Sequence, residues 1–150
     1  MLREKYYELI YRLCKLTGID NVTAMRELCE IQFGGAEFAL SYGGEVDEDG
    51  LYIYCDFGSV DEEKKAKVFE RLMQANLRTF GNGTPVFGFD SQRGMVIMML
   101  RLPVSQTSFE TLVTNLYAFS AHIEDWHNFI FTDDYEDEMK KMGQSPSAFQ

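Results

Sequence analysis

The fold is decided by residues 72–126, which read LMQANLRTFGNGTPVFGFDSQRGMVIMMLRLPVSQTSFETLVTNLYAFSAHIEDW. A helical segment ends in Gln-Ala-Asn, and a glycine-rich turn leads into a hairpin of two predicted strands, 84–90 and 95–102. A Leu-Pro step then leads into a long amphipathic helix that ends near Trp126. Because the stretch is rich in apolar residues and contains no catalytic motif, it favours recognition of another polypeptide over chemistry.

The second strand of this hairpin is apolar on both faces. Met95, Ile97 and Met99 point one way, and the alternate residues that point the other way are Val96, Met98, Leu100 and Leu102. A strand of this kind is covered on both sides in the folded protein. In a chain this short, we expect one of the two covers to be a second subunit.

The sequence before this stretch predicts one helix and three strands. The three-four spacing of apolar residues predicts a helix over residues 2–16, ended by Gly18. Residues 19–27 form either a loop or a short turn of helix. Gly34-Gly35 makes a tight turn between the first two strands, and an acidic loop precedes the third. Along each predicted strand, alternate apolar residues share one face: Cys29, Ile31 and Phe33, then Phe38, Leu40 and Tyr42, and then Leu51, Ile53, Cys55 and Phe57.

Two capping boxes predict the starts of the remaining helices. Ser59-Val60-Asp61-Glu62 is expected to open a helix that runs to about Phe80, and Thr107-Ser108-Phe109-Glu110 to open the last one. The predicted stripe of the middle helix is Ala66, Phe69, Leu72, Met73, Asn76, Leu77 and Phe80; that of the last helix is Phe109, Leu112, Val113, Leu116, Ser120, Ile123, His127 and Ile130. The order α-β-β-β-α-β-β-α favours an α+β fold with one antiparallel sheet and segregated helices.

The composition limits the classes of function. The chain has 150 residues, which is the length of one domain, and a net charge of −10. A surface this acidic disfavours both nucleic acids and anionic membranes as partners. The longest purely apolar run, Met95–Leu100, is far too short to span a bilayer, and the N-terminus lacks the apolar centre of a signal peptide. Three cysteines at wide spacings predict reduced thiols in a cytoplasmic protein.

The candidates for chemistry are weak. The acidic run from Glu45 to Gly50 resembles half of a calcium loop, but predicted strands flank it where such a loop needs helices. His122 and His127 lie roughly 140° apart around a helix, so they do not share a metal ion easily. The cysteines lie in apolar patterns, where burial leaves a thiol inert. We therefore predict no enzymatic activity, no metal and no cofactor. The eight methionines fit either a packed core or an adaptable binding surface.

The ordered set of motifs resembles the class I type III secretion chaperones, the Tir-chaperone family. The resemblance rests on Leu72-Met-Gln-Ala-Asn76-Leu, Gly83, Phe87-Gly-Phe-Asp90, Gly94, the apolar strand to Leu102-Pro103 and the helix to Trp126. Earlier in the chain, Cys29-Glu-Ile31, Asp49-Gly50-Leu51-Tyr-Ile53 and Phe57-Gly58 resemble the family's first three strands. The resemblance covers roughly residues 2–130. It predicts a chaperone-like domain at 1–131, followed by an acidic and mobile tail at 132–150 that is not a shared element.

The resemblance implies a homodimer in the bacterial cytoplasm that uses no nucleotide. Such a chaperone binds the N-terminal segment of a secreted effector, keeps it soluble and non-globular, and delivers it for export, with the secretion ATPase as a candidate further partner. For effector binding we predict the first helix and the early strands: Leu2, Tyr6, Leu9, Ile31, Phe33, Phe38 and Leu40. For the dimer interface we predict the middle helix and the last strand: Phe69, Leu72, Met73, Val96, Met98 and Leu100.

Two alternatives remain open at this point. A chaperone of this kind also fits a regulatory role, in which it sequesters an anti-activator or a secreted regulator of type III gene expression. A non-secretory adaptor or sensory domain of the same fold would bind folded partners and need no extended ligand.

Overall fold

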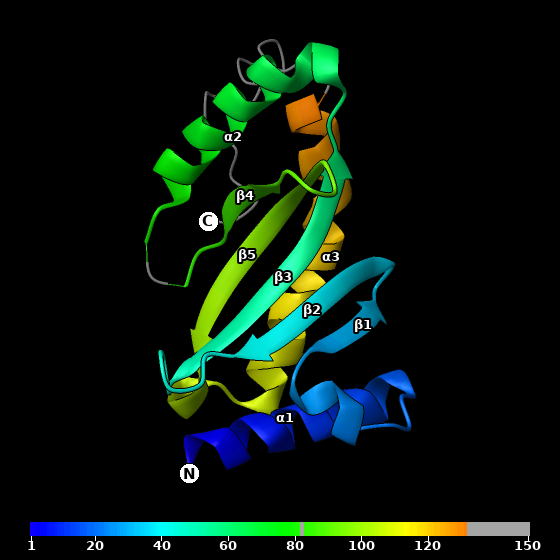
Figure 1. Ribbon diagram of the computed structural model, residues 1–150, viewed down its shortest axis with the longest axis vertical. Coiled ribbons are helices and arrows are strands. Elements are labelled where there is room, and N and C mark those ends of the chain that lie inside the picture. The colour runs from blue at the N-terminus through cyan, green and yellow to red at the C-terminus, as the bar shows by residue number, and fades with distance from the viewer. Residues whose placement is uncertain (82, 132–150) are drawn as a thin grey trace.

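The computed structural model describes residues 1–81 and 83–131, and in them a five-stranded antiparallel sheet is combined with three α-helices (Figure 1). The strand order is β1-β2-β3-β5-β4, so β1 and β4 are the two edges. The elements are α1 (Leu2–Thr17), β1 (Cys29–Phe33), β2 (Ala36–Tyr42), β3 (Gly50–Ser59), α2 (Lys65–Thr79), β4 (Val86–Asp90), β5 (Met95–Pro103) and α3 (Phe109–Phe131), with short 3₁₀ turns at Thr23–Arg26, Glu62–Lys64 and Val104–Gln106.

This architecture confirms the predicted order of elements and the α+β class. The first helix ends as expected, because Gly18 takes the left-handed conformation and its N–H reaches the Cys14 carbonyl. The ambiguous segment 19–27 contains one turn of 3₁₀ helix. Among the described residues, no helix has the length and the apolar composition needed to cross a membrane.

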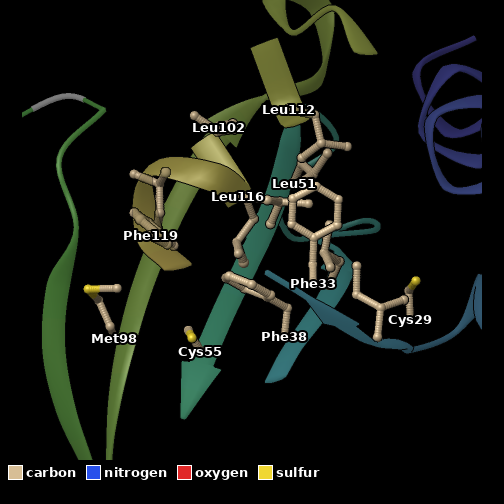
Figure 2. Packing of buried hydrophobic residues seen from close by; sticks show 14 of the residues in the cluster. Cys29, Phe33, Phe38, Leu51, Cys55, Met98, Leu102, Leu112, Leu116 and Phe119 are labelled. Atoms are coloured by element: carbon tan, nitrogen blue, oxygen red, sulfur yellow. The ribbon is translucent and has the colours of Figure 1, made fainter. Parts of the chain in front are cut away.

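The hydrophobic core is formed by one face of the sheet with the helices α1 and α3, and the buried side of α2 belongs to the same cluster. Alternate residues of β1, β3 and β5 are buried on this face, which is the period of two that the sequence predicts. Figure 2 shows Phe38, Leu51 and Met98 of the strands facing Leu116 and Phe119 of α3. The opposite face is less covered, since Tyr52, Tyr54 and Asp56 remain half-buried there.

The predicted start of the middle helix is wrong. Ser59 is the last residue of β3, and α2 begins only at Lys65 after a 3₁₀ turn, with no side-chain hydrogen bond at its N-cap. The residues that α2 buries are also not the predicted stripe; they are Val68, Arg71, Leu72, Ala75 and Thr79. Ser59 therefore belongs to β3 and does not cap the helix. The helix is also rotated about its axis relative to the prediction, so that Met73 and Leu77 face outward.

The cap of the last helix is shifted by one residue from the prediction. Ser108, and not Thr107, accepts the N–H of Thr111, at 3.1 Å. The Thr107 side chain is buried instead and donates to the Pro103 carbonyl at 2.6 Å. The tail at 132–150 and the side chains of His122 and His127 lie outside the residues that the structure describes.

Candidate functional site

The β1–β2 hairpin determines which backbone groups face the free edge of the sheet. Gly34 and Gly35 both have positive φ, +60° and +83°, as a two-residue type I′ turn requires. Phe33 and Ala36, on either side of this turn, form a hydrogen-bonded pair. Along an antiparallel ladder, hydrogen-bonded and non-hydrogen-bonded pairs alternate. The N–H and C=O groups of Glu30 and Gln32 therefore point away from β2. No described strand pairs with them, so this edge offers two donors and two acceptors.

Apolar side chains flank both ends of this edge. Leu28, directly before β1, is 44% exposed. At the other end, the Tyr117 ring of α3 packs edge-on against Phe33 with centroids 4.5 Å apart, yet remains 57% exposed. An extended segment beside β1 would therefore find hydrogen-bonding groups along its length and an apolar contact at each end.

The open face of the sheet carries two grooves of about 710 and 640 Å³. The first lies over Glu30 and Gln32 and is crossed by an ion pair, in which Arg93 donates to both carboxylate oxygens of Asp56 at 2.8 and 3.0 Å. The second lies over Tyr52 and Tyr54, with Met99 and Arg101 of β5 in its wall. Both grooves are lined by aromatic side chains, charged side chains and the surface of the strands. Neither groove places a nucleophilic side chain beside a base.

The acidic loop between β2 and β3 is used for structure. Asp47 accepts two hydrogen bonds from Arg101, at 2.6 and 2.8 Å, and a third from the Tyr52 hydroxyl at 2.5 Å. These bonds hold the pKa of Asp47 well below its usual range. Asp49 accepts from the Ser105 N–H and hydroxyl. In the described part of the chain, no three His, Cys, Asp or Glu side chains are placed to hold a metal ion.

The three thiols are buried in the core. Burial raises the pKa of Cys29 and of Cys55 to about 12, and it also raises the pKa of Cys14. Because the thiolate is the reactive form, these cysteines are poor nucleophiles at neutral pH. The features that face solvent are thus strand edge, grooves and apolar side chains, which suit the binding of a polypeptide.

The sequence of the chain decides the family. The family model of the Tir chaperone protein (CesT) family matches residues 8–127, which span α1 to α3. The chain belongs to the Tir chaperone protein family. No curated protein matches it in sequence.

Solved structures share the fold of this Tir chaperone family member at low sequence identity. The ExsC-ExsE complex is 16% identical, with a TM-score of 0.63 over 87% of this chain and 96% of that one. The ExoT-SpcS complex from Pseudomonas aeruginosa is 15% identical, with a TM-score of 0.56 over 81% and 96%. The type III secretion chaperone SycH of Yersinia pestis, in complex with a fragment of YscM2, is 13% identical, with a TM-score of 0.57 over 80% and 98%.

The residues predicted to bind an effector are mostly inside this Tir chaperone family member. Leu2 is half-buried, and the others are between 0 and 8% exposed: Tyr6, Leu9, Ile31, Phe33, Phe38 and Leu40. They come together as part of one core cluster. Side chains with so little exposed area have almost no surface left for a partner, whereas their exposed neighbours and the outward β1 backbone groups are accessible.

The residues predicted for the dimer divide in a similar way. Leu72 of α2 is 5% exposed, and Val96, Met98 and Leu100 are at most 3% exposed because this face of β5 packs on the core. Phe69 is half-buried, and only Met73, at 72%, is well exposed. The half-buried face of β5 carries Met95, Ile97 and Met99 instead.

Sequence reasoning missed the main exposed apolar stripe and the β1 backbone groups. Leu77 and Phe80 are 81 and 85% exposed beside Met73, at helical spacings of four and three. All three belong to the predicted stripe of the middle helix, and of them only Met73 is predicted for the dimer interface. The signal for the β1 edge was present, since the Gly-Gly turn fixes which residues of β1 face outward.

Proposed function

We propose that this Tir chaperone family member is a cytoplasmic export chaperone. It binds the extended N-terminal segment of a type III secreted protein, keeps that segment soluble and non-globular, and delivers it to the secretion machinery. The observation that carries the proposal is the family membership over residues 8–127 together with the open β1 edge.

The geometry of β1 supports strand addition as the mode of binding. An extended peptide that pairs with an exposed edge gains main-chain hydrogen bonds, and its alternate side chains enter flanking pockets. Glu30 and Gln32 supply the outward backbone groups, and Leu28 and Tyr117 supply the apolar contacts. A main-chain ladder needs no folded partner, which suits a client that must stay non-globular.

The relatives in solved structures support a protein client. One is titled as the HopA1-SchA chaperone-effector complex, with a TM-score of 0.57 at 14% identity over 85% of this chain and 94% of that one. That structure contains a chaperone bound to an effector. Such identity carries the fold alone, so the client of this chain is part of the proposal.

We also propose that two copies associate through α2. Met73, Leu77 and Phe80 form an apolar stripe on a helix whose other face is already packed. A stripe of this kind is rare on a monomer and is typical of an interface. The partner copy's open sheet face offers half-buried apolar groups such as Met99 for it to cover.

We propose no catalytic activity for the chain. The described grooves pair no nucleophile with a base, and the thiols are buried.

The test is native mass spectrometry on the protein purified gently from its own bacterium. We expect the mass of two copies plus one further polypeptide, which protease trims to an N-terminal fragment. A secreted effector among the captured chains supports export, whereas an anti-activator or secreted regulator supports the regulatory role. A monomer with no bound chain would count against both the dimer and the chaperone function, and would favour the adaptor alternative.

A further inference from the structure

The second edge of the sheet, β4, is not open in the way that β1 is. An edge strand normally presents unpaired N–H and C=O groups to which another strand can add. β4 pairs with β5 on one side only. On its other side lies α2, which Figure 1 shows running beside it.

The side-chain amide of Asn76 occupies both outward backbone groups of Phe87. Its Nδ2 donates to the Phe87 carbonyl at 3.0 Å, and its Oδ1 accepts the Phe87 N–H at 2.7 Å. In an antiparallel ladder a residue directs both groups to the same side, so Phe87 and Met98 form a non-hydrogen-bonded pair. Asn76 thus gives Phe87 the donor and the acceptor that a residue of a neighbouring strand would give.

α2 also contacts the residues two positions before and two positions after Phe87 on this edge. Pro85 has no N–H, and its carbonyl accepts from the Thr79 hydroxyl at 3.3 Å. Farther along, the Phe89 ring packs edge-on against Phe69 with centroids 4.8 Å apart.

These contacts come from one side of α2. Thr79, Asn76 and Phe69 are three and seven residues apart, which places them on one stripe of the helix. This explains a polar amide within the apolar stripe that the sequence predicts. The helix takes the place of a sixth strand.

We propose that Asn76 is a specificity-determining residue that closes the β4 edge, so that strands add to the sheet at β1 alone. The part that concerns the client rests on the proposed function. Without Asn76, the Phe87 N–H and C=O lose the two hydrogen bonds that Asn76 makes to them. The occupant we expect in its place is β4 of a second copy, because identical edge strands pair readily in the antiparallel sense.

The first test is residue-level hydrogen exchange by NMR on the full chain with no client. In the wild type, we expect the Asn76 Nδ2 protons and the Phe87 amide to exchange slowly. In Asn76→Ala, the Phe87 amide should exchange at least tenfold faster, while the Gly88 amide, which faces β5, keeps its protection. Gln74→Ala is the matched control, because Gln74 is an exposed amide on the same helix.

Either of two results would overturn the closure of the edge. One is fast exchange of the wild-type Asn76 side chain, which requires no variant to fold. The other is an unchanged Phe87 amide in folded Asn76→Ala.

The second test is the assembly size measured by sedimentation across a range of protein concentrations. Asn76→Ala should form assemblies larger than those of the wild type, and Gln74→Ala should not. If Phe87 is deprotected in Asn76→Ala but the assemblies do not grow, Asn76 does not restrict strand addition and the proposal fails. Because neither test uses a client, their outcome is independent of whether β1 captures one.

Discussion

Gln32→Pro is the sharpest test of strand addition at β1. The Gln32 N–H points away from β2, so proline removes a donor at the free edge without breaking the β1–β2 ladder. The Gln32 side chain is exposed, and its one hydrogen bond, to Glu37, is long at 3.4 Å. The change should therefore alter the free energy of unfolding by less than about 1 kcal/mol, as surface substitutions usually do.

The effect on client binding should be much larger. Losing one hydrogen bond costs about 0.5–1.5 kcal/mol, and a client carbonyl left buried without a donor adds about 1–3 kcal/mol. A total of about 1.5–4.5 kcal/mol weakens binding about 10- to 2000-fold.

The assay is a fluorescence anisotropy titration with the N-terminal segment of the client recovered by native mass spectrometry. Gln32→Thr is the control, because it changes the same side chain but keeps the N–H and should bind within about twofold of the wild type. Urea unfolding of both variants verifies that the chain remains folded. An unchanged Kd in folded Gln32→Pro would refute strand addition at this edge.

Three further predictions follow from the packing. Leu77→Glu should convert the dimer to monomer without lowering the melting temperature of the monomer, because Leu77 is 81% exposed; a dimer of unchanged mass would exclude α2 from the interface. Gly34→Ala should destabilise the fold in urea more than Gly35→Ala: both have positive φ, but only at Gly34 would the new Cβ meet the Ser120 Oγ, at 2.5 Å. Equal losses would show that the hairpin does not approach α3. Asp47→Asn should destabilise at pH 7, and since the pKa of Asp47 is lowered in the folded state, the difference from wild type should shrink as the pH falls below about 4; a difference that persists to low pH would show that the carboxylate charge is not the cause.

The fold was largely predictable because burial alternates along the strands. The pattern of β1 and β3 gives their buried faces directly, and Gly18 and the Gly-Gly turn mark where elements end. The α2 start was not predictable from Ser59-Val60-Asp61-Glu62, because β3 pairs with β5 as far as Ser59. A local capping motif was overridden by a long-range ladder.

The candidate surface was less predictable, since an apolar residue in a pattern does not reveal which element covers it. The sequence predicts Ile31 for effector binding, and it predicts Met98 for the dimer interface because the strand of Met98 is apolar on both faces. Both side chains instead belong to the hydrophobic core, with 5 and 0% exposure. The apolar spacing likewise predicts Leu77 in the stripe of the middle helix, although α2 packs through Val68, Leu72 and Ala75.

The difference between the two sheet edges shows what sequence patterns omit. At β1, the outward groups follow from a two-residue turn, so their positions are encoded locally. At β4, they are satisfied by Asn76, which lies eleven residues before Phe87 and on a different element. In the pattern of apolar residues, Asn76 is only a polar interruption of the helical stripe. Its two hydrogen bonds to the Phe87 backbone make it the residue that ends the sheet. Because a protein that binds extended chains must limit where strands add, the residue that breaks the pattern is the one to test for specificity.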